Sequence, residues 1–146
     1  SLDVRKDDSV LEIGTGSGFI TACLSALARR VVSVELFEEL FLEAEVRLRA
    51  RNSQNTELCV GDVMSGWQPQ QAHDVVVVTG SVPAVPEFFR DWVNPGGRMF
   101  LVVGESPAMQ ARLLTRGGFS DWREESLFET DLPYLMNSTA PAGFEF

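Results

Sequence analysis

Three glycines stand at alternate positions directly after a short apolar run. Residues 10–21 read VLEIGTGSGFIT, with Gly14, Gly16 and Gly18 at the point where the apolar run ends. Glycine has no Cβ, so a ligand can approach the backbone closely there. A turn between a strand and a helix also presents backbone N–H groups that have no partner within the helix. The pattern therefore predicts either a ligand-binding turn or, more simply, a tight turn with no ligand.

Two acidic residues stand where the next two expected strands end. Glu35 comes 21 residues after Gly14, and Asp62 follows the strand after that. In a doubly wound sheet both residues lie on the rim where ligands bind, and a carboxylate on this rim can accept hydrogen bonds from the two hydroxyls of a ribose. Asp62 could accept one from an adenine amino group. Glycines and acids together outline a nucleoside site. The alternatives are a helix-start carboxylate at Glu35 and a turn former at Asp62.

The elements needed to position these residues can be predicted from the apolar pattern. The run DVVVV is unbroken and β-branched, as in a central strand buried on both faces. We expect strands at 9–13, 30–35, 56–60, 74–78 and 98–103, helices after the glycines and within 37–48 and 86–92, a loop at 80–86 and a turn at 94–97. Residues 109–116, then Gly117 and Gly118, then 119–132 predict an antiparallel hairpin.

This order of elements predicts an α/β fold. We expect a Rossmann-like three-layer sandwich with a seven-stranded, mainly parallel sheet and a C-terminal antiparallel hairpin. The 146 residues contain no repeat and no linker, so we expect one domain over 1–146.

Composition narrows the possible partners. The net charge of −9 disfavours nucleic acid, because such a surface repels a phosphate backbone. No apolar stretch approaches the ~18 residues of a membrane span, and no signal peptide is visible. We expect Cys23 and Cys59 to be reduced core residues and the protein to be cytoplasmic. We also expect His73 to have a structural role and no metal to be bound.

Several stretches carry a family resemblance. The pattern G-x-G-x-G, preceded by Glu12 and followed in order by Glu35 and Asp62, resembles class I S-adenosylmethionine-dependent methyltransferases more than the G-x-G-x-x-G of dinucleotide-binding proteins. Within that superfamily, VLEIGTGSGFITACLSALARRVVSVE, HDVVVVTGSVPAVPEFFRDWVNPGGRMFLVVG and SLFETDLPYLMN resemble the protein-L-isoaspartate O-methyltransferases. Departures at Gly66-Trp67, at 79–81 and at 127–130 suggest a bacterial side branch.

The resemblance implies S-adenosylmethionine as cofactor and an L-isoaspartyl protein or peptide as substrate, in a reaction that serves protein repair. It places the methionine part at Gly14, Gly16 and Gly18, the ribose at Glu35, the adenine at Asp62 and Val63, and the sulfonium beside Thr79. The full set of expected cofactor contacts is Glu12, Gly14, Thr15, Gly16, Ser17, Gly18, Glu35, Leu36, Gly61, Asp62, Val63 and Thr79. Thr15 and Ser17 have the alternative role of capping the following helix.

The family also carries an N-terminal segment with a Ser/Thr motif that contacts the substrate. Only nine residues precede Val10, so no catalytic residue is assigned, and apolar surface left uncovered could favour a homodimer. A different methyl acceptor, a non-catalytic cofactor-binding module and an NAD-dependent oxidoreductase remain alternatives. The glycine spacing disfavours the oxidoreductase.

Overall fold

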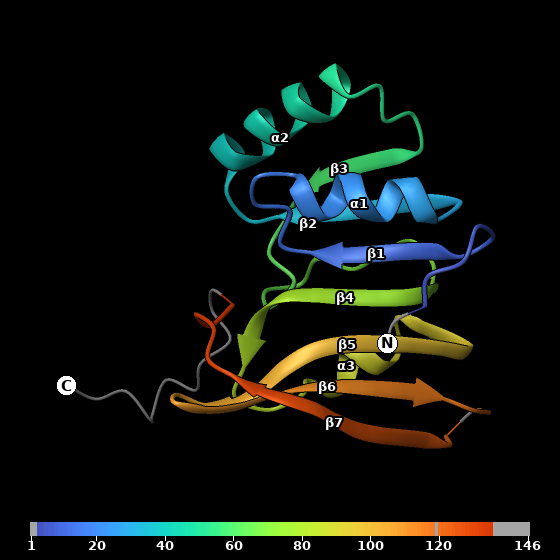
Figure 1. Ribbon diagram of the computed structural model, residues 1–146, viewed down its shortest axis with the longest axis vertical. Coiled ribbons are helices and arrows are strands. Elements are labelled where there is room, and N and C mark those ends of the chain that lie inside the picture. The colour runs from blue at the N-terminus through green and yellow to red at the C-terminus, as the bar shows by residue number, and fades with distance from the viewer. Residues whose placement is uncertain (1–2, 119, 136–146) are drawn as a thin grey trace.

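The computed structural model describes residues 3–118 and 120–135, and its elements follow one another in the expected order (Figure 1). One seven-stranded sheet runs through the molecule. The elements are β1 (Ser9–Ile13), α1 (Phe19–Leu27), β2 (Arg30–Glu35), α2 (Glu38–Ala50), β3 (Thr56–Val60), β4 (His73–Val82), α3 (Glu87–Arg90), β5 (Val93–Glu105), β6 (Ala108–Arg116) and β7 (Trp122–Thr130).

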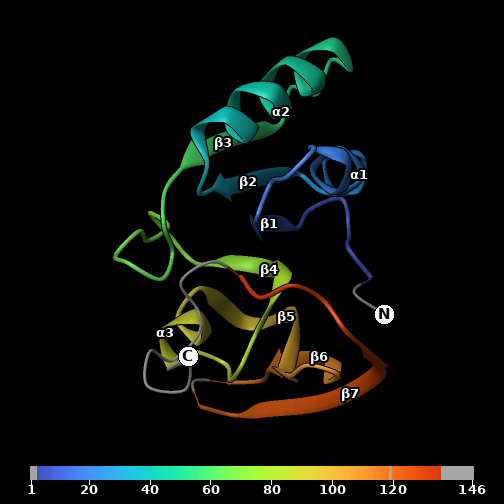
Figure 2. The same cartoon turned by 90° about the vertical axis from the view of Figure 1, so that its left-hand side faces the viewer.

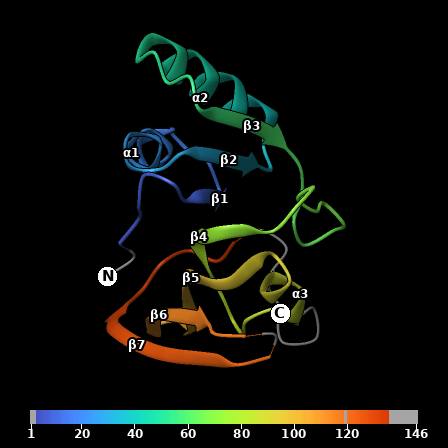
Figure 3. The same cartoon turned by 90° about the vertical axis from the view of Figure 1, so that its right-hand side faces the viewer.

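The sheet has the order β3-β2-β1-β4-β5-β6-β7. Strands β1 to β5 pair in parallel, and β6 and β7 add the antiparallel hairpin that the sequence predicts. From β1 the chain moves toward one edge of the sheet, to β2 and then β3, whereas from β4 it moves toward the other edge, to β5. Crossovers between parallel strands are right-handed, so crossovers in opposite directions place their helices on opposite faces. Helices α1 and α3 therefore lie on opposite faces of the sheet, as Figures 2 and 3 show. The predicted three-layer sandwich is confirmed.

The core fills both faces of the central strands. On the face of α3, Phe89 and Trp92 pack against alternate residues of β1, β4 and β5. On the face of α1, Leu24 packs with Val10, Val31 and residues of β4. Because β4 is buried on both faces, every residue of its central valine run contributes to one cluster or the other.

The largest departures from the sequence-based boundaries are in β4 and β5, whereas the expected hairpin strand at 119–132 is only shortened to Trp122–Thr130. The expected turn at 94–97 is wrong as a separate element, because these residues lie within β5. Val93 pairs with His73 and Arg98 with Val75, so residues 94–97 form a bulge with Gly96 at a φ of 84°. The expected loop at 80–86 is shorter than predicted, because β4 continues to Val82.

The two long helices bury less than their apolar patterns predict. On α1 the buried residues are Thr21 and Leu24, whereas Cys23 is exposed. On α2 the buried residues are Ala44 and Leu48. The prediction that Cys23 is a core residue is therefore wrong, and Cys59 is only half-buried. Periodicity marks an apolar face, but only tertiary packing decides how much of that face is covered.

Candidate functional site

A cavity of about 250 Å³ opens at the carboxyl ends of the parallel strands. Crevices at this end of an open α/β sheet are where ligands bind. Seven of the cofactor contacts predicted from the sequence line it, and they come from the glycine turn, from the ends of β2 and β3, and from β4. They are Gly14, Glu35, Leu36, Gly61, Asp62, Val63 and Thr79. The fold thus brings residues that are far apart in the chain to one hollow.

The glycine turn has a backbone that other residues rarely adopt. Gly14, Gly16 and Gly18 have φ values of 96°, 54° and 85°. At Gly14 the space is also limiting, since an added Cβ would overlap the hydroxyl of Thr79. At Gly16 no atom lies within 4 Å of such a Cβ. The turn therefore needs glycine at position 14 for both conformation and space, and at position 16 for conformation alone.

Glu35 ends β2 directly beneath this turn. Its carboxylate accepts a hydrogen bond from the Gly16 N–H at 2.8 Å and another from the Phe37 N–H at 3.1 Å. Because a carboxylate offers about four lone-pair positions, two acceptor positions remain for a ligand. Glu35 thus joins the glycine turn to the start of α2 and keeps acceptor capacity at the cavity.

Asp62 follows β3 and shapes the adjoining loop. One carboxylate oxygen accepts from the Met64 N–H at 2.9 Å, and its backbone carbonyl accepts from the N–H groups of Ser65 and Trp67. This is the turn-forming role considered as an alternative for this residue. The loop places the Trp67 indole against Gly61, where a Cβ would overlap the ring.

Thr79 closes the cavity on the side of β4. Its hydroxyl lies 2.8 Å from the carbonyl oxygens of both Ile13 and Gly14, and it donates its proton to this pair. The side chain is exposed, and it covers the first glycine of the turn. Thr79 therefore fixes the distance between β4 and the glycine turn.

Five of the predicted residues do not line the cavity: Glu12, Thr15, Gly16, Ser17 and Gly18. Ser17 does not take the N-cap position considered as its alternative role, because Gly18 occupies that position of α1. The Ser17 hydroxyl instead accepts from the Phe19 N–H at 3.3 Å. The Thr15 hydroxyl does not cap the helix either, and bonds to Ser33 Oγ at 2.6 Å.

Glu12 lies beneath the turn and is fully buried. Its Oε1 accepts hydrogen bonds from the hydroxyls of Thr21 and Ser33, whereas its Oε2 has no partner among the described residues. Burial raises the pKa of this carboxyl from 4.5 to about 7, against the opposing effect of the two hydroxyls. The nearby charge of Glu35 raises it further.

Sequence reasoning missed one wall of the cavity, formed by Pro133, Tyr134 and Leu135. This segment pairs with the end of β4: the Ser81 N–H donates to the Pro133 carbonyl at 3.1 Å, and the Leu135 N–H donates to the Ser81 carbonyl at 2.7 Å. The Ser81 hydroxyl adds a bond to Leu132 O at 2.9 Å. The family resemblance included this stretch, within SLFETDLPYLMN, but carried no sign that it reaches the cavity. Position 119 of the expected hairpin lies outside the described residues, and so do residues 136–137, the last two of SLFETDLPYLMN.

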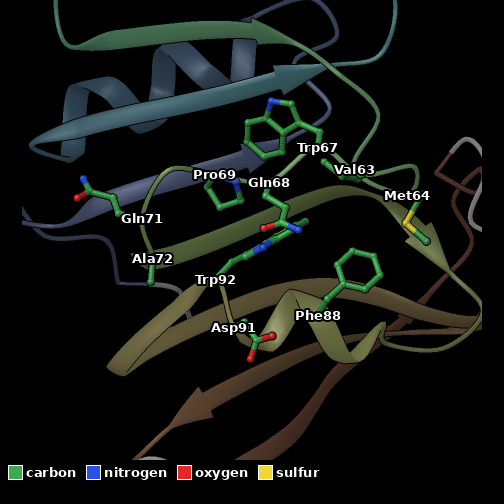
Figure 4. A pocket seen from close by; sticks show the side chains of 11 residues that line it. Val63, Met64, Trp67, Gln68, Pro69, Gln71, Ala72, Phe88, Asp91 and Trp92 are labelled. Carbon is green, nitrogen blue, oxygen red and sulfur yellow. The ribbon is translucent and has the colours of Figure 1, made fainter.

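A second hollow, of about 530 Å³, lies between the loop after β3 and α3. Figure 4 shows Trp67, Trp92 and Phe88 around it. The two indoles meet edge to face at 6.2 Å, and Asp91 is the only ionisable side chain among its lining residues. This hollow has neither the glycine turn nor an acid at a strand end, so the smaller cavity is the candidate site.

His73 lies away from the candidate site, at the start of β4. The ring is buried and its Nδ1 bonds to the Ser9 hydroxyl at 2.7 Å, while burial lowers the pKa of the imidazole. This agrees with the structural role expected for it. The described residues contain no group of three or more His, Cys, Asp or Glu side chains able to hold a metal ion.

Comparisons with known proteins bear on this geometry. The family model "Protein-L-isoaspartate(D-aspartate) O-methyltransferase (PCMT)" matches residues 1–121. Protein-L-isoaspartate O-methyltransferase 2 of Pelobacter propionicus is 40% identical over 128 residues, which cover 87% of this chain and 57% of the relative. The chain thus spans about half the length of the curated relatives that it matches.

Solved structures agree with the family model. A protein-L-isoaspartate O-methyltransferase structure superposes with a TM-score of 0.83 at 25% identity, covering 94% of this chain and 44% of that one. A putative enzyme of the same name from Plasmodium falciparum, in complex with S-adenosyl-L-homocysteine, gives a TM-score of 0.76 at 15% identity, covering 90% and 67%. With the family model matching most of its length, the chain belongs to the protein-L-isoaspartate(D-aspartate) O-methyltransferase family.

Proposed function

We propose that the protein binds S-adenosylmethionine in the cavity at the strand ends and transfers its methyl group to the carboxylate of an L-isoaspartyl residue in a protein or peptide. The observation that carries the proposal is the convergence of the glycine turn, Glu35 and Asp62 on one hollow. Family membership supports it, as does the S-adenosyl-L-homocysteine in the Plasmodium falciparum structure.

In this proposal each part of the cofactor has its own neighbours. Glu35 accepts the ribose hydroxyls through its remaining lone pairs. Leu36 and Val63 contact the adenine, with Asp62 and the Gly61 backbone at its polar edge. The methionine part lies along the turn from Gly14 to Gly18, and Thr79 adjoins the sulfonium.

The proposed chemistry needs little from the protein beyond alignment. A carboxylate oxygen of the substrate forms a bond to the methyl carbon while the carbon–sulfur bond breaks, and S-adenosylhomocysteine leaves. The carboxylate is already ionised at neutral pH, so no proton has to be removed. Positioning and exclusion of water supply the rate increase. The adjacent backbone nitrogen can then attack the ester carbonyl, and methanol leaves. Hydrolysis opens the resulting succinimide in part to normal aspartate and so repairs the residue.

Transfer of labelled methyl from S-adenosylmethionine tests the function. An isoaspartyl peptide should be labelled, and its aspartyl twin should not. Labelling of neither peptide, with S-adenosylhomocysteine still bound, would exclude this acceptor and leave another methyl acceptor or a non-catalytic binding module. Displacement of S-adenosylhomocysteine by NAD would instead indicate an oxidoreductase.

Replacing Glu35 by alanine should weaken S-adenosylhomocysteine binding by about 1–3 kcal/mol, because the ribose hydroxyls lose their charged acceptor. Titration calorimetry with the 2′,3′-dideoxy analogue separates this loss from any change in the turn. Wild type should bind the analogue more weakly than it binds S-adenosylhomocysteine. The Glu35→Ala variant should bind the two ligands with equal affinity. Glu43→Ala, which removes an exposed carboxylate of α2, is the control and should leave both affinities unchanged. Equal discrimination by wild type and Glu35→Ala would contradict the ribose assignment.

We also propose that residues 1–146 act as one domain without a nucleic-acid partner and with a cytoplasmic location. The net charge of −9 and the two free cysteines support this. Phe19 and Leu27 of α1 and Val46 of α2 are exposed apolar residues that support a homodimer, and a monomeric sedimentation profile would oppose it. No helix in the described part of the chain is long and apolar enough to cross a membrane.

A further inference from the structure

Glu12 is a fully buried ionisable group for which the proposed chemistry has no direct use. Its side chain lies on β1 with 0% exposure and does not line the cavity, although it stands two residues before the first glycine of the turn. Burying a carboxyl is costly unless its oxygens are well bonded. Its placement beneath the turn therefore calls for a reason other than contact with the cofactor.

The hydroxyl partners of Glu12 supply that reason, because they lie on two different elements and one of them leads on to the glycine turn. Thr21 lies on α1 and Ser33 on β2, and each donates to Glu12 Oε1. Ser33 Oγ also bonds to Thr15 Oγ1 at 2.6 Å, and Thr15 is part of the glycine turn. One carboxylate oxygen thus connects the first helix, the second strand and the turn.

The direction of this chain of hydrogen bonds follows from proton counting. A hydroxyl has one proton to donate, and that of Ser33 goes to Glu12. The bond between Thr15 and Ser33 must then use the Thr15 proton. The carboxylate of Glu12 therefore orients the Ser33 hydroxyl directly and the Thr15 hydroxyl through Ser33. The bond from Ser33 to the ionised carboxylate is stronger than a bond between two neutral groups.

Thr15 passes this constraint to the backbone of the turn. Its carbonyl accepts the Gly18 N–H at 3.0 Å, which closes the turn at the N-cap of α1. The Gly16 N–H, one residue after Thr15, is the group bound by Glu35. The turn is consequently held from below by Glu12, through Ser33 and Thr15, and from the cavity side by Glu35.

We propose that Glu12 is a positioning residue, which shapes the glycine turn for the cofactor through Ser33 and Thr15 without touching the cofactor itself. This inference rests on the proposed function, because it assumes that the cofactor binds along the turn. It changes the role that the sequence pattern suggests for Glu12 from contact to support. Thr15 becomes the link between the buried carboxyl and the site.

A double-mutant cycle on S-adenosylhomocysteine binding tests this inference. Glu12→Gln and Ser33→Ala should each weaken binding about 10-fold, the effect of one hydrogen bond to a charged group. If Glu12 acts through Ser33, the double variant should bind no more weakly than the weaker single variant. A loss of about 100-fold in the double variant, the product of two independent effects, would overturn the inference.

Two further measurements make the result specific. Thr15→Val, which keeps the shape of the side chain and removes its hydroxyl, should weaken binding as Ser33→Ala does and should also be non-additive with Glu12→Gln. The affinity of wild type for S-adenosylhomocysteine should rise between pH 6 and pH 8 as Glu12 ionises, whereas the affinity of Glu12→Gln should not change with pH. Glu35 is the charged group near Glu12 that raises its pKa. Additive losses with Thr15→Val, or a parallel pH dependence, would count against the inference. Absence of binding by folded wild type would instead remove the proposed function.

Discussion

Relative to Glu12→Gln, the wild-type protein should lose about 3 kcal/mol of unfolding free energy between pH 4.5 and pH 8. Burial raises the pKa of this carboxyl from its ordinary 4.5 to about 7. Below pH 4.5 the group is protonated in both the folded and the unfolded protein, and the full stability is present. As the pH rises to 7, the unfolded chain ionises while the folded protein retains its proton, so stability is lost. Above pH 7 the loss is complete.

The variant should therefore be the more stable protein at pH 8, and the two proteins should be similar near pH 5. Urea unfolding at a series of pH values measures the difference. His73 contributes with the opposite sign, because burial lowers its pKa and its stabilisation is lost as the pH falls below 6.5. That contribution is common to both proteins and cancels in the comparison. Glu43→Gln, at an exposed carboxylate, should follow the wild-type profile, and parallel profiles for Glu12→Gln and wild type would contradict the prediction.

Replacing Gly14 by alanine should lower the unfolding free energy by about 2–6 kcal/mol and abolish S-adenosylhomocysteine binding at micromolar concentrations. Two costs add at this position. The φ of 96° is unfavourable for any residue with a Cβ, at about 1–3 kcal/mol. The new methyl group would also overlap the Thr79 hydroxyl, which holds β4 to the turn, at a further cost of about 1–3 kcal/mol.

Gly16→Ala is the matched control for this prediction. Its φ of 54° is the left-handed conformation that costs a non-glycine residue about 1–2 kcal/mol, and no atom lies within 4 Å of the new Cβ. It should therefore destabilise the protein clearly less than Gly14→Ala. Adding Thr79→Ala to Gly14→Ala removes the overlapping oxygen and should recover part of the lost stability. Equal destabilisation by both glycine substitutions, with no relief from Thr79→Ala, would show that close packing at Gly14 is unimportant.

Local sequence determined the elements and their order. Local patterns were sufficient to predict the central strand from the unbroken valine run of β4. They were also sufficient to place Gly14, Glu35 and Asp62 at the ends of strands. Because parallel strands share one edge for their carboxyl ends, the convergence of these residues on one cavity could be predicted as well. The family resemblance rested on the same local motifs.

Only the tertiary structure decided the features that depend on contacts between segments distant in the chain. The bulge at 94–97, the continuation of β4 to Val82 and the cavity wall at 133–135 each depend on pairing with another segment, and such pairing cannot be recognised from the local sequence. The exposure of Cys23 depends on what covers α1. The hydroxyl partners of Glu12 come from 9 and 21 residues away, so its chemistry exists only once α1 and β2 have packed around β1.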